Sequence, residues 1–121
     1  MVEPAEVPPL PRHVTVTKID ISDGGIDEAA VKQALEAKFS GFERCYAEVR
    51  ETTPEAEGRM ILSYLYMAGE RKSVSASHSG AGAGALNDCF RGVAGEVNLA
   101  PDAAVERTSI FVEMSMKREP E

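Results

Sequence analysis

The sequence has no tryptophan, and aromatic residues make up only 6% of its 121 residues. Small aliphatic side chains and the five methionines must therefore fill much of any hydrophobic core. No stretch approaches the ~20 apolar residues that a membrane-spanning helix needs. Positive charge is also scarce, because 13 lysines and arginines stand against 20 aspartates and glutamates, for a net charge of −7. Since phosphates and anionic membranes attract basic surfaces, we expect neither nucleic acid nor a membrane as partner.

Few residues are candidates for catalysis, metal binding or phosphate binding. His13 and His78 are the only histidines, and no second ligand is spaced beside either for a metal ion. No G-x-S-x-G motif is present, and the acidic residues are scattered rather than paired. The GAGAGA segment at 80–85 lacks the Lys-Ser/Thr of a phosphate loop, so it indicates a loop that enters a helix. We therefore expect no metal, no cofactor and no catalytic residues.

The length suits one globular domain, and 43% hydrophobic residues can supply its core. Residues 1–13, MVEPAEVPPLPRH, are proline-rich and predict a semi-rigid linker. They lack the basic and apolar regions of a signal peptide, so export would require a longer parent protein. We assign residues 14–117 to the domain and residues 118–121 to a frayed polar tail.

Strands are predicted where apolar and polar residues alternate. The segments are 14–21, 59–67, 71–78 and 107–117, with 59–67 and 71–78 forming an antiparallel hairpin. In the last segment one face carries Ile110, Val112, Met114 and Met116. We also expect Tyr64 and Tyr66 to pack in the core rather than to form a stacking platform.

Helices are predicted where apolar residues recur at steps of three and four. The first is one continuous helix over 27–51, with Asp27 as its N-cap and an end near Glu51 or Thr52, because Pro54 disfavours helical geometry. A shorter second helix carries Leu86, Cys89, Phe90 and Val93. Helices that share one face of an antiparallel sheet give an α+β two-layer domain.

The two cysteines lie 44 positions apart and form no C-x-x-C motif. Cys45 and Cys89 each lie at the margin of a helix's apolar stripe, so helices on the same sheet face could bring them together. Two buried free thiols, as in a cytosolic core, are an equally good interpretation of the spacing. A catalytic cysteine with His78 as its base is a weaker one, because nothing in the sequence activates the pair.

Several landmarks follow one another in an order that is more specific than any one of them. They are Gly24-Gly25-Ile26-Asp27, Cys45-Tyr46, Pro54, Gly58-Arg59, Gly69, Cys89 and a terminal alternating strand. Over residues 19–116 this order resembles the AgmX/PglI C-terminal domain. That domain is a TonB-like periplasmic module, abundant in myxobacteria and linked there to gliding-motility and envelope proteins.

The resemblance implies a TonB-like fold, with two helices on a three-stranded antiparallel sheet and, in this chain, a short additional N-terminal strand. It implies a disulfide between Cys45 and Cys89. It also places the domain in the periplasm, at the end of a proline-rich arm whose parent is anchored in the inner membrane. The chain departs from the family after the second helix, where a Trp-x-Phe-Pro-like motif is replaced by residues 96–101, EVNLAP. We expect Val97 and Leu99 to fill the apolar space.

The function that the resemblance implies is a non-enzymatic interaction domain that couples the inner-membrane parent to an envelope partner, in gliding motility or energy-transducing transport. The expected mode is addition of a partner strand at the edge formed by the last strand, through Thr108, Ile110, Val112 and Met114. Two alternatives stay open. One is a cytosolic thiol enzyme or redox sensor that uses Cys45 or Cys89, and the other is a structural envelope domain that binds peptidoglycan.

Overall fold

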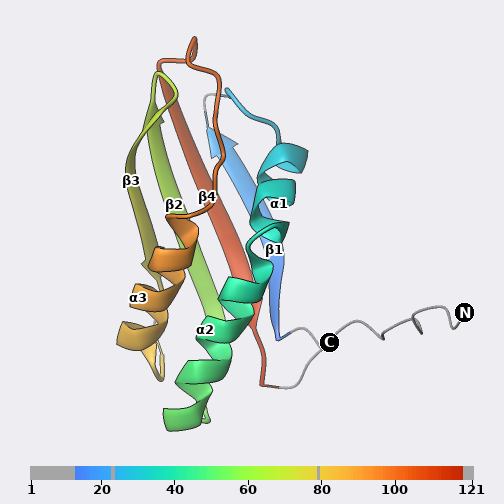
Figure 1. Cartoon of the computed structure of the whole chain (residues 1–121), viewed down its shortest axis with the longest axis vertical. Coiled ribbons are helices and arrows are strands. Elements are labelled where there is room, and N and C mark those ends of the chain that lie inside the picture. The colour runs from blue at the N-terminus through green and yellow to red at the C-terminus, as the bar shows by residue number, and fades with distance from the viewer. Residues whose placement is uncertain (1–12, 23, 79, 119–121) are drawn as a thin grey trace, which may run out of the picture.

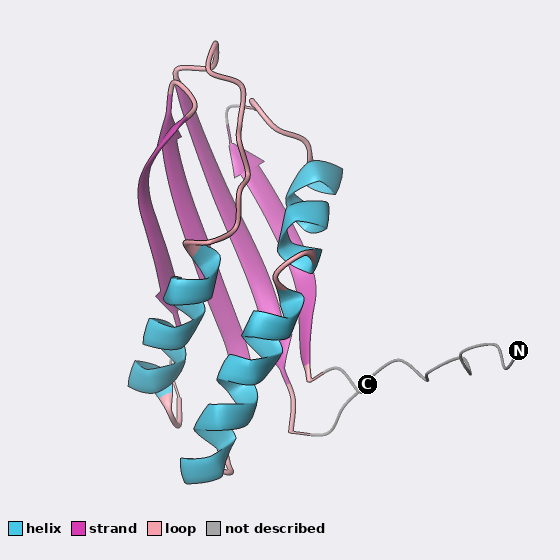
Figure 2. Ribbon diagram, in the orientation of Figure 1, coloured by secondary structure: helices cyan, strands magenta, loops and turns pink. Residues whose placement is uncertain are grey.

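A computed structural model describes residues 13–22, 24–78 and 80–118 of the chain. They form an α+β domain in which one antiparallel sheet is covered by helices on a single face (Figure 1; Figure 2). The strands are β1 (Val14–Ser22), β2 (Gly58–Met67), β3 (Glu70–Ser77) and β4 (Arg107–Met116), and the helices are α1 (Glu28–Glu36), α2 (Phe39–Thr52) and α3 (Ala83–Ala94). The predicted proline-rich linker, apart from His13, and the predicted tail, apart from Arg118, lie outside the described residues.

The sheet has the strand order β1-β4-β2-β3, and all three pairings are antiparallel. The four predicted strands and the hairpin of β2 with β3 are confirmed. The predicted three-stranded sheet with a short extra strand is wrong, because β1 pairs with β4 from Val14 to Ser22 and is a full member of the sheet. Its β-branched residues reach the core through Val14, which is fully buried.

The predicted continuous helix over 27–51 is also wrong, because it is divided into α1 and α2 at Ala37 and Lys38. Lys38 has φ −114° and ψ 11°, and its N–H bonds to the Leu35 carbonyl at 3.0 Å, a tighter turn than that of an α-helix. Ser40 and Gly41 follow at once, and Ser/Gly pairs are a common site of helix kinks. The break lets α1 lie over β1 while α2 packs against α3.

The outer ends of this helical pair agree with the sequence. The Asp27 side chain accepts a hydrogen bond from the Ala30 amide at 2.7 Å and caps α1, as predicted. α2 ends at Thr52, two residues before Pro54. Since one face of both helices is apolar, the stripe predicted for a single helix still faces the sheet on either side of the break, through Val31, Leu35, Phe39, Phe42, Tyr46 and Val49.

The core lies between the helices and the inward faces of β2 and β4. Tyr64 and Tyr66 are buried there, as predicted, and the rings of Phe42 and Phe90 meet at 5.2 Å between α2 and α3. Two tyrosine hydroxyls donate to carbonyls inside the domain: Tyr46 to Ala56 at 2.5 Å and Tyr64 to Ala94 at 2.9 Å. Each of these two buried hydroxyl groups therefore has a hydrogen-bond acceptor inside the core.

Gly41 provides the first test of this packing. A Cβ there would lie 3.0 Å and 3.2 Å from the two Cγ atoms of Val93 on α3. Alanine favours the helix by ~1 kcal/mol over glycine, but overpacking costs ~1–3 kcal/mol. We expect Gly41→Ala to lower the free energy of unfolding by about 1 kcal/mol, and to raise it by up to about 1 kcal/mol when Val93 is first changed to Ala. Denaturant unfolding of the four proteins of this cycle measures both values, and equal effects in both backgrounds would contradict the proposed contact.

The tyrosines provide a second test, at alkaline pH. Burial raises the pKa of Tyr46, Tyr64 and Tyr66 above 10, most strongly for Tyr64. A raised pKa in the folded state gives stability that is complete below the unfolded pKa of ~10 and is lost as the pH rises through the folded pKa. Above pH ~10 we expect the free energy of unfolding to fall by about 1.4 kcal/mol per pH unit from Tyr64 alone. Tyrosinate absorbance should rise together with the loss of circular dichroism. A tyrosinate signal with its midpoint near pH ~10 in protein that is still folded would contradict the burial of the phenols.

Candidate interaction surface

The edge predicted for partner binding is not an edge. β4 lies inside the sheet and pairs with β1 on one side and with β2 on the other. Thr108, Ile110, Val112 and Met114 are all buried, and the Thr108 hydroxyl donates to the Gly24 carbonyl at 3.0 Å. The prediction fails because β1 takes the place beside β4 that a partner strand would need. The edges of the sheet are β1 and β3.

The β1 edge is poorly suited to receive another strand. Its register with β4 shifts between Val16 and Lys18, so Thr17 forms a bulge. The Thr17 hydroxyl bonds to the Glu113 side chain at 2.9 Å, and Lys18 pairs with Asp20 at 3.4 Å. Bulges and charged side chains are devices that protect an edge from further pairing.

The β3 edge is more regular. Its bulge lies at Lys72, where the register with β2 shifts, and residues 73–77 then pair with Leu65 to Ile61 without interruption. These five residues, SVSAS, carry no charge and no proline. Ser73, Ser75 and Ser77 are exposed, while Val74 and Ala76 are half-buried on the helix side. The edge therefore offers main-chain groups with little side-chain obstruction.

α3 holds β3 in place from one side. The two elements pack together, and Arg71 donates to the Gly95 carbonyl at 2.6 Å, just beyond the last turn of α3. A cation at this end of a helix is favourable because the last carbonyls carry partial negative charge. The edge strand is thus supported against the core without being covered at its free side by a further strand of the sheet.

α3 is in turn joined to α2 by the bond between Cys45 and Cys89. The structure places their Cα atoms 5.7 Å apart and the sulfur atoms at bonding distance, which is the pairing that the resemblance implies. Cys45 is buried and Cys89 half-buried, at the margins of the two apolar stripes. The bond therefore fixes the two helices that flank the core, α3 being the one that supports β3.

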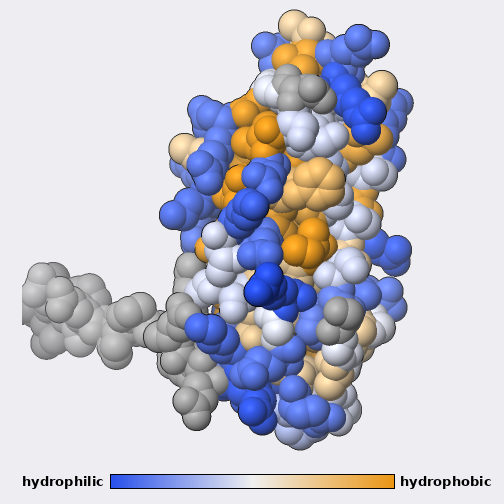
Figure 3. All heavy atoms as spheres, turned by 180° about the vertical axis from the view of Figure 1, so that it is seen from behind, coloured by the Kyte–Doolittle hydropathy of each residue, from blue (hydrophilic) through white to orange (hydrophobic). Residues whose placement is uncertain are grey.

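None of the described helices or strands covers the sheet face opposite the helices, here called the uncovered face, and it carries apolar side chains. Phe111 is 44% exposed, Met67 37% and Ile61 36%, and half-buried Leu65 lies on the same face. Figure 3 shows this face, where a patch of hydrophobic residues near the middle lies beside a line of hydrophilic ones. The face is a second candidate surface for protein contact.

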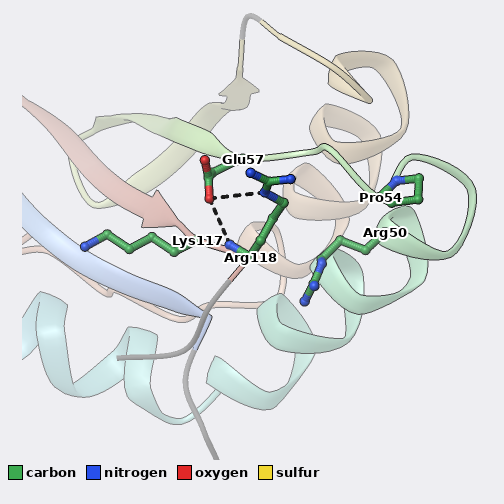
Figure 4. Close-up of a pocket in the computed structure, with 5 residues that line it drawn as sticks. All are labelled: Arg50, Pro54, Glu57, Lys117 and Arg118. Carbon is green, nitrogen blue, oxygen red and sulfur yellow. Dashed lines mark hydrogen bonds and ion pairs between the residues drawn. The ribbon is translucent and has the colours of Figure 1, made fainter.

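A surface hollow is a third candidate site. Its lining consists of Arg50, Pro54, Glu57, Lys117 and Arg118 (Figure 4). Arg118 donates its amide to Glu57 at 3.1 Å and pairs with it through its guanidinium at 3.6 Å, which lowers the pKa of Glu57. The guanidinium of Arg50 lies over the Tyr46 ring, 5.4 Å from its centre, and Lys117 extends away from Arg118. The basic groups therefore do not converge on one point, and we assign no ligand to the hollow.

The two histidines take structural positions. His78 is 6% exposed and its Nδ1 lies 2.8 Å from the Arg59 carbonyl, to which it donates, while His13 Nδ1 lies 3.0 Å from the Lys117 carbonyl. In the described ranges no three His, Cys, Asp or Glu side chains gather closely enough to hold a metal ion. No helix among the same residues is both long enough and apolar enough to cross a membrane.

Comparisons with protein-family models, curated proteins and solved structures find no match. The proposals below therefore depend on the sequence pattern and on the geometry of the described residues.

Sequence reasoning missed both candidate surfaces. The β3 edge has a signal in the alternating serines of 73–77, which mark a strand with one polar face, but nothing in that pattern says that the strand lies at an edge. The uncovered face has a signal in Ile61, Leu65 and Phe111, which occupy positions that alternation assigns to solvent.

The disulfide gives the third test. Closing a loop of about 45 residues stabilises a domain by roughly 4 kcal/mol in the chain-entropy model. We expect reduction, Cys45→Ala and Cys89→Ala each to lower the free energy of unfolding by about this amount, since each removes the same bond. Denaturant unfolding with and without reductant measures the loss of stability. Free cysteines in the native protein are counted by quenching cells rapidly with acid, which traps the thiols, and then alkylating them. Two free thiols in those cells, or no loss of stability on reduction, would contradict the bond.

Proposed function

We propose that this domain is a non-enzymatic interaction module that takes an extended segment of a partner protein as a fifth strand beside β3. The observation that carries the proposal is the uncharged edge of residues 73–77, which pairs regularly with β2 on one side and with no strand of the described chain on the other. Main-chain hydrogen bonds would provide affinity, and alternate side chains would provide selectivity.

The surroundings of β3 define the segment that it would accept. One set of alternate side chains would lie beside Val74 and Ala76 at the margin of α3, where small apolar residues fit. The other set would lie beside Ser73, Ser75 and Ser77, where polar residues fit. Because the chain has a net charge of −7, a neutral or basic segment would approach faster than an acidic one.

We further propose that the domain is TonB-like and related to the AgmX/PglI C-terminal domains, as the C-terminal part of an inner-membrane-anchored parent. In this proposal it couples that parent to a periplasmic or outer-membrane partner, in gliding motility or energy-transducing transport. Three observations support the proposed family relationship and the periplasmic location. Helices lie on one face of an antiparallel sheet, Cys45 and Cys89 are bonded, and a proline-rich segment precedes the domain. Val97 and Leu99 are buried where the family has aromatic residues.

The disulfide also bears on the compartment. Structural disulfides persist in oxidising compartments such as the periplasm and are rare in the cytosol. A thiol enzyme or redox sensor needs a free cysteine that its substrate can reach, whereas Cys45 is only 2% exposed and the half-buried Cys89 is held in the bond with it. These observations favour an interaction domain outside the cytoplasm over the cytosolic thiol alternative.

The strand-addition proposal can be tested with a displayed library of random dodecapeptides selected for binding to the oxidised domain. We expect bound peptides to shift the amide resonances of residues 73–77 and to slow their hydrogen exchange, because the new strand protects them. Ser75→Lys should weaken binding at least about tenfold, since a lysine on the edge hinders pairing.

Ser22→Lys, at the β1 edge, is the matched control and should change affinity less than about twofold. If binding peptides instead shift β1 or the hollow at Arg50, or if both lysine variants bind equally well, the β3 edge is not the site.

A further inference from the structure

We propose that the uncovered face of the sheet pairs with the same face of a second copy of this chain, giving a face-to-face dimer. The face is defined by the residues whose side chains point away from the helices. On the inner strands these include Ile61, Ser63 and Leu65 of β2, and Ser109 and Phe111 of β4. The proposal is independent of the β3 edge, because it uses the face of the sheet and leaves both edges free.

The distribution of residue types on this face is that of an interface. Ser63 pairs with Phe111 and Leu65 with Ser109, so Phe111 lies diagonally between Ile61 and Leu65, within reach of both, on the two inner strands. The outward positions of the edge strands instead carry serines, Thr15, Lys18, Asp20 and Glu70. An apolar centre inside a polar rim is the usual anatomy of a protein–protein interface, whereas an antiparallel sheet that faces only water carries polar residues outward.

The charge of the face favours a copy of the same chain. Its outward positions, together with the bulged Lys72, carry four basic residues and three acidic ones, which gives a net charge of 4 − 3 = +1. They are Lys18, Arg59, Lys72, Arg107, Asp20, Glu70 and Glu113. The whole chain carries −7, so the rest of the sequence carries −7 − 1 = −8. Two acidic chains repel each other least when they meet through this near-neutral face.

These charges are also largely paired within the chain. Arg59 lies 3.5 Å from Glu113, and Lys18 lies 3.4 Å from Asp20. The ion pair of Lys72 with Glu70, at 3.4 Å, lies at the hairpin end of the sheet. An approaching copy would therefore meet local ion pairs, one of them on the inner strands, rather than a field of one sign.

The area of the face is adequate for such a dimer. Four strands of eight to ten residues, at ~3.3 Å per residue and a width of ~4.8 Å per strand, cover roughly 600 Å² per copy. Two copies would bury about 1,200 Å², at the lower end of specific interfaces, so we expect a reversible dimer in the micromolar range. Face-to-face sheets pack ~10 Å apart, a distance that Phe111, Ile61 and Met67 can fill from both sides.

The test is sedimentation equilibrium of the oxidised chain from about 1 μM to about 1 mM. We expect a monomer–dimer equilibrium. Ser63→Lys, which places a like charge at the centre of the face on both copies, should raise the dissociation constant at least about tenfold. Ala47→Lys introduces the same charge at an exposed position of α2 and should change it less than about twofold. Phe111→Ser provides a second disruption if circular dichroism shows that Ser63→Lys impairs folding.

Three results would overturn the proposal. One is a monomer throughout the concentration range. Another is a dimer that both Ser63→Lys and Phe111→Ser leave intact. The third is a dimer that is lost with Ser75→Lys but retained with Ser63→Lys, which would show that copies pair edge to edge through β3 instead.

Discussion

The double pairing of β4 is the constraint on which the rest of the structure depends. Residues 107–116 form hydrogen-bonded ladders with β1, nearly a hundred positions earlier in the chain, and with β2, about fifty positions earlier. These ladders join the first and last strands of the domain into one sheet. They bury Ile110, Val112, Met114 and Met116 against the helices and leave Phe111 on the opposite face. Because β4 has two partners, the sheet has its edges elsewhere, and the candidate surfaces follow from that.

Packing on the sheet, rather than the helical periodicity of the sequence, decides where α1 ends and α2 begins. α1 and α2 share one apolar stripe, yet the chain kinks at Ala37 and Lys38 so that α1 follows β1 and α2 reaches α3. Gly41 permits a close approach to Val93, and the bond between Cys45 and Cys89 fixes the same pair of helices further along. β3 packs against α3, and the disulfide joins α3 to α2. A crosslinked pair of helices therefore holds β3 in place.

Two surfaces with different physical characters result. The β3 edge offers main-chain donors and acceptors beside small side chains, which suits an extended segment of another protein. The uncovered face offers aromatic and aliphatic side chains within a polar rim, which suits a preformed surface. Because one uses the edge of the sheet and the other its face, a dimer formed through the face would leave both β3 edges available to bind partner segments.

The sequence by itself determined the strands, the hairpin, the capping of α1 by Asp27, the end of α2 near Pro54 and the inward face of β4. Each of these depends on alternation, helical spacing or a local backbone rule, all of which act within a few residues. The bonding of Cys45 to Cys89 could be inferred only from the order of landmarks, since spacing alone left it open. Tertiary structure decided the kink at Lys38, the place of β1 beside β4, and therefore which strands are edges. Periodicity records which side chains face the core, but it does not record the strand neighbours, because pairing is set by contacts between segments far apart in the chain. The resemblance placed Thr108, Ile110, Val112 and Met114 at an open edge, whereas the pairing of β1 with β4 puts them in the middle of the sheet.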